Sequence, residues 1–134
     1  MYFNKNCYKL AEPILGASGN IMSLTSELAS KIDTIKPIIF VNNAWGGSSV
    51  KEWAAKDSKL TKYTNDNLKY LIKNKKSKLK FFIWIQGEED AFSGINYRDE
   101  FKKTKKNIFN TIAKEDLKDL TTIITQTSIC YDKE

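Results

Sequence analysis

Short apolar runs alternate with amphipathic helical patterns from one end of the chain to the other. Runs of four to eight apolar-rich residues are typical of buried strands, whereas apolar residues spaced by three or four positions lie on one face of a helix. Strands that alternate with helices are joined by right-handed crossovers into a parallel sheet. The pattern therefore predicts an α/β sandwich. The expected elements, in chain order, are helix 21–35, strand 38–41, helix 60–72, strand 81–85, helix 97–112 and strand 120–127.

The amount of apolar side chain is sufficient for one domain with a hydrophobic core. Hydrophobic residues make up 41% of the 134 residues, and 12% are aromatic. No internal repeat or low-complexity linker divides the sequence, so we expect a single domain over residues 1–134. The longest apolar run, 81–85, has five residues, far fewer than the roughly 20 that a membrane-spanning helix needs. The first residues lack the apolar core of a signal peptide, so the chain as written is expected in the cytoplasm, with its compartment otherwise undetermined.

The sequence contains no histidine. By itself the chain therefore cannot complete a Ser-His-Asp or Cys-His arrangement, and it cannot form a histidine-ligated zinc site. Any interpretation as a hydrolase has to account for this.

Basic residues outnumber acidic ones, 22 to 16, which gives a formal charge of +6. Arg98 is the one arginine, so the positive charge is carried almost entirely by lysine. Specific recognition of phosphates and bases favours the planar fork of arginine. We therefore expect a solvated lysine surface and no nucleic-acid partner.

A glycine- and serine-rich loop follows the expected strand 38–41. Paired glycines, Gly46 and Gly47, let the backbone turn tightly and bring main-chain N–H groups close to a ligand oxygen. Ser48 and Ser49 come next and can cap the following helix. Taken alone, this string is more typical of a plain strand-to-helix turn.

An amide and three carboxylates follow the expected strand 81–85. Gln86 can donate to a developing oxyanion, and a carboxylate such as Glu88 can hold a neighbouring donor in position. The alternative is a solvated acidic loop that stabilises the N-terminus of the next helix through its dipole. Consecutive acidic residues point in different directions, so a cation bound by Glu88, Glu89 and Asp90 is not expected.

Together the two loops resemble conserved blocks of the SGNH (GDSL-like) hydrolases, in the branch that contains sialate O-acetylesterases and acetylxylan esterases. Residues 42–53 fit N-x-A-x-G-G-S-S-x-x-x-W, and residues 84–91 fit W-x-Q-G-E-x-D-A. Residues 8–13 are similar to the W-x-x-A-x-E/D-P stretch of that branch, and residues 97–101 to its Y-x-x-x-F segment. The resemblance implies a three-layer α/β/α sandwich with a parallel, flavodoxin-like sheet. It corresponds to the middle of the family's domain, so the first strand and the C-terminal helix are expected to be missing.

The resemblance also implies roles for individual residues in hydrolysis of O-acetyl esters on sugars, with an acetylated carbohydrate as the partner and no metal or cofactor. The backbone N–H of Gly47 and the side chain of Gln86 would be oxyanion-hole donors, and Glu88 would be the buried carboxylate that organises the site. The residues implied to contact substrate are Gly46, Ser48, Asn43 and Asp90.

The chain departs from the family at the nucleophile and the base. The family's serine lies in a G-Q-S-N-like block after its first strand, and its histidine lies in a D-x-x-H block after its last strand; neither block occurs here. The resemblance therefore predicts a fragment of an esterase that carries the oxyanion side of the site without a complete triad. A missing central strand would leave an unpaired sheet edge, through which the chain would self-associate.

Ser18, in the segment Gly-Ala-Ser-Gly-Asn, superficially resembles a nucleophile turn. The preceding residues include Glu12 and Pro13 and make a poor central strand, so the sharp strand-turn-helix geometry lacks its first element. We expect Ser18 to be a helix cap, and we keep it only as an alternative nucleophile.

Three functional hypotheses follow from these patterns. The first is a carbohydrate O-acetylesterase domain of SGNH type that is inactive as this chain alone. The second is a non-catalytic descendant that binds an acetylated sugar or a protein. The third is a lysine-rich nucleic-acid binder, which the near absence of arginine disfavours.

Overall fold

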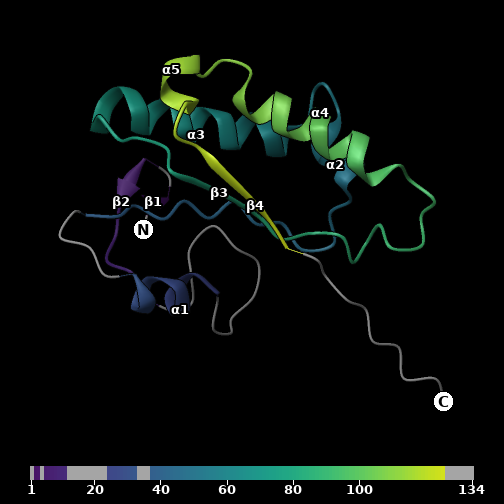
Figure 1. The fold of residues 1–134 in the computed structure, drawn as a ribbon, viewed down its shortest axis with the longest axis horizontal. Helices are drawn as coiled ribbons and strands as arrows, with labels where there is room; N and C mark the ends of the chain where they lie inside the picture. The colour runs from purple at the N-terminus through teal and green to yellow at the C-terminus, as the bar shows by residue number, and fades with distance from the viewer. Residues whose placement is uncertain (1, 4, 12–23, 33–36, 126–134) are drawn as a thin grey trace. The chain divides into compact units, whose positions relative to one another are not determined.

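The computed structural model describes residues 2–3, 5–11, 24–32 and 37–125. The chain divides into two compact units, residues 1–46 and residues 47–134 (Figure 1). No helix among the described residues is long and apolar enough to cross a membrane.

The first unit contains a small hairpin and one helix. Strand β1 (Tyr2–Phe3) pairs antiparallel with β2 (Asn6–Cys7), and Lys5 adopts a φ of 63° in the turn between them. Helix α1 (Leu24–Lys31) confirms the described part of the helix expected over 21–35, whose remaining residues are mostly outside the described ranges. None of the residues of α1 is buried.

The apolar run 38–41 does not form the predicted strand. Residues 38–40 have no regular secondary structure, and Val41 makes only an isolated β-bridge. Apolar composition favours a strand, but a strand also needs a ladder of hydrogen bonds from a neighbour. Among the described residues no such ladder exists for this run.

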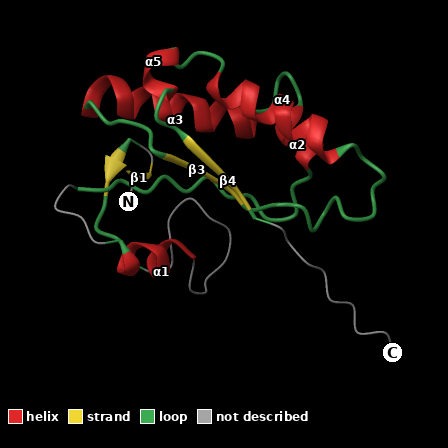
Figure 2. Ribbon diagram, in the orientation of Figure 1, coloured by secondary structure: helices red, strands yellow, loops and turns green. Residues whose placement is uncertain are grey.

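The second unit is a mixed α/β structure with a parallel pair of strands. Strands β3 (Phe81–Trp84) and β4 (Thr121–Ile124) are parallel, with Phe81 opposite Thr121 and Trp84 opposite Ile124. The pairing confirms the predicted parallel arrangement and both predicted strands, although the observed strands are shorter: Ile85 follows β3, and Leu120 and Thr125 flank β4. Residues 126–127 lie outside the described residues. The helices of this unit lie on one side of the two strands (Figures 1 and 2). They are α2 (Val50–Ala54), α3 (Lys59–Lys75), α4 (Tyr97–Phe109) and α5 (Lys114–Leu117).

Helix α3 forms where the sequence pattern predicts it. The Ser58 side chain accepts a hydrogen bond from the Thr61 backbone N–H and so caps its start. Leu68 and Leu71 are buried on its inner face, while its lysines are exposed. Lys76, in the left-handed conformation with φ of 50°, ends the helix.

The core of the second unit consists of two clusters that meet at Phe82. One cluster contains Val50, Trp53, Trp84 and Phe101; the other contains Leu68, Ile108, Phe109 and Ile112. Phe82 is half-buried and packs against both clusters, with ring centroids 6.0 Å from Trp84 and 5.2 Å from Phe109.

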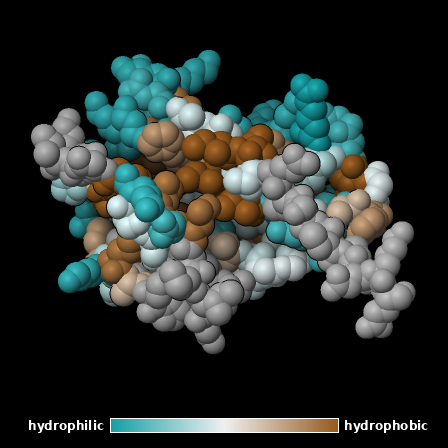
Figure 3. Space-filling view, turned by 60° about the horizontal axis from the view of Figure 1, so that its bottom comes forward, coloured by the Kyte–Doolittle hydropathy of each residue, from teal (hydrophilic) through white to brown (hydrophobic). Residues whose placement is uncertain are grey.

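Strand β3 is not buried on both faces as predicted. Successive side chains of a strand point to opposite faces, and the side chains of Phe82 and Trp84 lie in the clusters under the helices. The intervening and flanking residues are less covered: Phe81 is 65% exposed and Ile85 is 50% exposed. Figure 3 shows apolar residues gathered on one face of the molecule. The described residues thus establish helices against a parallel pair of strands, and a further layer on the other face stays a prediction.

Candidate functional site

The loop before α2 is organised by its two serines. The Ser49 side chain accepts from the Glu52 backbone N–H at 3.3 Å, and the Ser49 backbone N–H donates to Glu52 Oε2 at 2.7 Å. This reciprocal arrangement is a capping box. Ser48 is buried, and its hydroxyl accepts from Trp53 Nε1 at 2.8 Å. The interpretation of both serines as capping or loop-supporting groups is therefore confirmed.

Gly47 has a backbone conformation that favours glycine. Its φ is 69°, and a Cβ built on it would have no atom within 4 Å. The need for glycine at this position is therefore set by the backbone angle and not by crowding.

The side-chain amide of Gln86 connects the second loop to the first. Its Nε2 donates to the backbone oxygen of Ser48 at 3.0 Å and to Asp90 Oδ2 at 2.6 Å. Its Oε1 accepts from the Tyr97 hydroxyl at 2.7 Å. Because Ser48 O and the Asp90 carboxylate can only accept, the NH₂ group must face them, which fixes the orientation of the amide.

Asp90 is the buried carboxylate of this loop. It is 8% exposed, and its Oδ2 accepts from the backbone N–H of Val50 at 2.7 Å as well as from Gln86. Its Oδ1 is buried and has no hydrogen-bond partner among the described residues. Glu88 is exposed, so the prediction that Glu88 would be the buried carboxylate is wrong. Of the three consecutive acidic residues, Glu88 and Glu89 are exposed and Asp90 is buried.

Tyr97 is a member of this network that the sequence did not single out as a site residue. Its hydroxyl accepts from Trp84 Nε1 at 2.8 Å. The one hydrogen of this hydroxyl faces two acceptors of Gln86, the backbone oxygen at 2.8 Å and Oε1 at 2.7 Å. Burial raises the pKa of the Tyr97 phenol above its usual 10.0; the charges of Asp90 and Glu88 also raise it, against the lowering effect of the Trp84 hydrogen bond. At neutral pH Tyr97 therefore keeps the proton that it donates. The sequence signal for this role was the match of residues 97–101 to the Y-x-x-x-F segment of the esterases.

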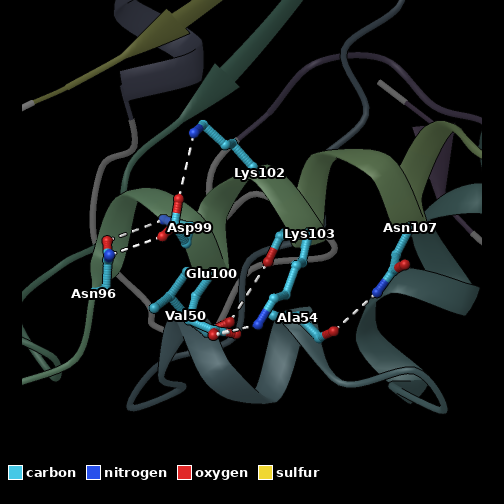
Figure 4. A network of polar contacts seen from close by, with 9 residues as sticks. Val50, Ala54, Asn96, Asp99, Glu100, Lys102, Lys103 and Asn107 are labelled. Atoms are coloured by element: carbon cyan, nitrogen blue, oxygen red, sulfur yellow. Dashed lines mark hydrogen bonds and ion pairs between the residues drawn. The ribbon is translucent and has the colours of Figure 1, made fainter.

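Helix α4 contacts both ends of α2. Asn107 Nδ2 donates to Ala54 O at 2.9 Å (Figure 4). The Thr104 hydroxyl donates to Val50 O at 3.5 Å. The Asn96 side chain caps α4 by accepting from the Asp99 backbone N–H. The two loops are thus mounted on packed helices, which suits a site that depends on fixed geometry.

The structure brings together three of the residues predicted for the site: Ser48, Gln86 and Asp90. Gly47 directly precedes Ser48. Asn43 and Gly46 belong to the first unit, whose placement relative to the second is not determined. Ser18 lies outside the described residues. No group of three or more His, Cys, Asp or Glu side chains in the described ranges could hold a metal ion.

Comparison with protein families assigns the chain to a class. Residues 11–133 match the model of a carbohydrate esterase family, described as sialic acid-specific acetylesterase. The chain is therefore a member of the carbohydrate esterases. Because the match covers most of the chain, it belongs to the sialic acid-specific acetylesterase family in particular. Neither the curated proteins nor the solved structures gave a significant match.

Proposed function

We propose that this chain provides the oxyanion side of a site that hydrolyses O-acetyl esters on sugars of the sialic acid type by a serine mechanism. The observation that carries the proposal is the Gln86 amide, which lies against the Gly47–Ser48 turn and is held there from both ends. The family match supports the chemistry and the acetylated-sugar substrate. Residues 1–134 would then be one partial domain of a three-layer sandwich.

The proposed role follows from where charge develops during ester hydrolysis. Attack on the acetyl carbonyl carbon moves negative charge onto its oxygen, and preorganised N–H donors stabilise that oxyanion. Gln86 Nε2 and the backbone N–H of Gly47 are the proposed donors. The loss of one such donor typically lowers the rate by roughly 10²- to 10³-fold.

In the free chain both hydrogens of the Gln86 NH₂ group are already donated, to Ser48 O and to Asp90 Oδ2. A substrate oxygen therefore has to replace one of these acceptors. Ser48 O is the neutral one and hence the weaker acceptor. We propose that the acetyl oxygen takes its place.

The sequence contains no histidine and no G-Q-S-N-like block, so we propose that the base, and with it the serine nucleophile of the family, come from outside this chain. Imidazole supplied in solution can stand in for them, because it attacks p-nitrophenyl acetate directly. Without imidazole, we expect the chain to hydrolyse this ester poorly. With imidazole, we expect the rate of ester hydrolysis to be higher in the presence of the chain than in buffer with imidazole alone.

Gln86→Ala should remove about 99% of that excess rate, the effect of losing one oxyanion donor. Asn74→Ala is the matched control, because Asn74 is also an amide but lies exposed on α3. The oxyanion role would be excluded if the wild-type chain gave no rate above that of imidazole in buffer. It would also be excluded if Gln86→Ala and the wild type gave the same rate above it.

The alternative is a binding module that keeps the site without its chemistry. The full use of both Gln86 hydrogens within the free chain is the observation that favours it. Tight binding of an O-acetylated sialic acid, without any excess rate in the imidazole assay, would select the binding module over the esterase site.

A further inference from the structure

Asp90 ties the two loops to each other through a single oxygen atom. Oδ2 accepts from the start of α2, at Val50 N, and from the Gln86 side chain. Val50 lies 40 residues before Asp90 in the sequence, whereas Gln86 lies only four residues before it. The carboxylate therefore sets the position of Gln86 relative to the Gly47–Ser48 turn.

The two hydrogens of the Gln86 NH₂ group are held unequally. One is donated at 2.6 Å to a buried carboxylate, and the other at 3.0 Å to a neutral carbonyl. Hydrogen bonds to charged acceptors in a buried site are shorter and roughly twice as strong as neutral ones. The Gln86 hydrogen donated to Asp90 thus holds the amide in place, and the Gln86 hydrogen donated to Ser48 O is the one that can move to another acceptor.

The second oxygen of Asp90 adds no hydrogen bond among the described residues. Oδ1 is buried without a hydrogen-bond partner among the described residues, and such a group lowers the stability of a fold. Stabilisation of the fold by this oxygen therefore does not account for the residue, whereas the two contacts of Oδ2 do give it a defined role.

We propose that Asp90 is a positioning residue: it anchors one hydrogen of the Gln86 amide and directs the other toward Ser48 O, where a ligand oxygen can compete for it. The identity of that ligand as an acetyl ester rests on the proposed function. The positioning itself rests on the contacts of Asp90, Gln86 and Val50 and can be tested in the free chain.

The experiment is NMR of the ¹⁵N,¹³C-labelled full chain and its Asp90→Asn variant, with the Gln86 side-chain amide and the Val50 backbone amide as reporters. An asparagine keeps the shape but is a neutral, weaker acceptor. We expect the Gln86 proton that faces residue 90 to lose its low-field shift, and the Val50 amide to exchange about 10- to 100-fold faster. Glu89→Gln, at the exposed neighbouring carboxylate, is the matched control and should leave both reporters unchanged.

A purely structural role predicts a different result. The unfolding midpoint of Asp90→Asn would then change while the Gln86 side-chain signals matched those of the wild type, and that outcome overturns the proposal. If Asp90→Asn does not fold, the wild-type chain decides: a through-hydrogen-bond coupling between Gln86 Nε2 and the Asp90 carboxylate carbon is expected, and its absence also overturns the proposal.

Titration with an O-acetylated sialic acid separates this inference from the proposed function. In the wild type we expect a change in the chemical shift of the Gln86 proton that faces Ser48 O, and no change for the Gln86 proton that is donated to Asp90. The unacetylated sugar should change neither chemical shift. A shift of the Asp90-bound proton instead overturns the positioning role. Free-chain reporters that respond as expected, in a chain that binds no acetylated sugar, support the positioning role and count against the esterase function.

Discussion

The two units of the chain both contain apolar sequence patterns, but they differ in whether the apolar side chains are buried. Every buried residue in the described ranges lies between Ser48 and Ile112, in the second unit. The first unit has an amphipathic helix and an apolar run as well, yet none of its described side chains is buried. Periodicity therefore predicts which face of an element is apolar, whereas burial depends on a partner for that face.

The largest expected effect tests this contrast in the cores. Ile108 is 1% exposed, whereas Leu24 of α1 is 53% exposed. Ile108→Ala should lower the free energy of unfolding by about 2–5 kcal/mol because it removes buried methyl groups and leaves a cavity. Leu24→Ala should cost less than about 0.5 kcal/mol. Urea unfolding followed by tryptophan fluorescence measures both, and equal losses would break the comparison.

Buried polar contacts provide the second test. Asn65 is buried and donates to Ile108 O at 2.5 Å, while its Oδ1 accepts from the Thr111 hydroxyl. Asn65→Ala leaves buried groups unpaired and should cost about 1–3 kcal/mol. Thr25→Ala, which removes the half-buried contact of Thr25 with Asn42 in the first unit, should cost about 0.5–1.5 kcal/mol. Urea midpoints in the opposite order would contradict the difference between the units.

Helix capping gives a smaller effect. Ser49→Ala removes the capping box of α2 and should cost about 1 kcal/mol. Ser30 in α1 is exposed and its hydroxyl donates to Glu27 O, so Ser30→Ala serves as the control in the first unit and should change the unfolding midpoint little. A larger loss for Ser30→Ala than for Ser49→Ala would show that α1 is the better anchored helix.

The smallest effect is a dependence on pH. Because the folded pKa of Tyr97 is raised, the folded state holds the phenolic proton more tightly than the unfolded state does. Its contribution to stability is therefore complete below the unfolded value of about 10 and is lost as the pH rises through the folded pKa. The absorbance of ionised tyrosine can be followed as the pH rises in the wild type and in Tyr97→Phe. The difference between the two curves should have a midpoint at a pH above 10.0. The same subtraction with Tyr8→Phe, in the first unit, is the control, and a Tyr97 midpoint below 10.0 would contradict the buried network.

Much of the second unit was predictable because its signals are local and its elements find partners. The spacing of Leu68 and Leu71 predicts α3, and the serine string predicts the cap of α2. The resemblance to esterases named Gln86 and Asp90 as site residues, and the structure brings their side chains together.

What the sequence could not provide was the orientation of individual side chains. It could not distinguish Asp90 from Glu88 as the inward-facing carboxylate, because that choice depends on the turn that brings Oδ2 to Val50 N. It did not identify Tyr97 as a site residue, because that role depends on how α4 brings the Tyr97 hydroxyl to Gln86. The strand expected over 38–41 was wrong because strand formation requires a neighbour that composition does not reveal.

Phe82 makes the second unit behave as one cooperative body. Its ring packs against both core clusters, so neither cluster can loosen without exposing the same aromatic surface. The cluster around Val50 and Trp84 carries the two loops, and the cluster around Ile108 lies toward the other end of α3 and α4. The position of the Gln86 amide thus depends partly on core residues outside the two loops, and substitutions in the cluster around Ile108 can change how well the amide is held.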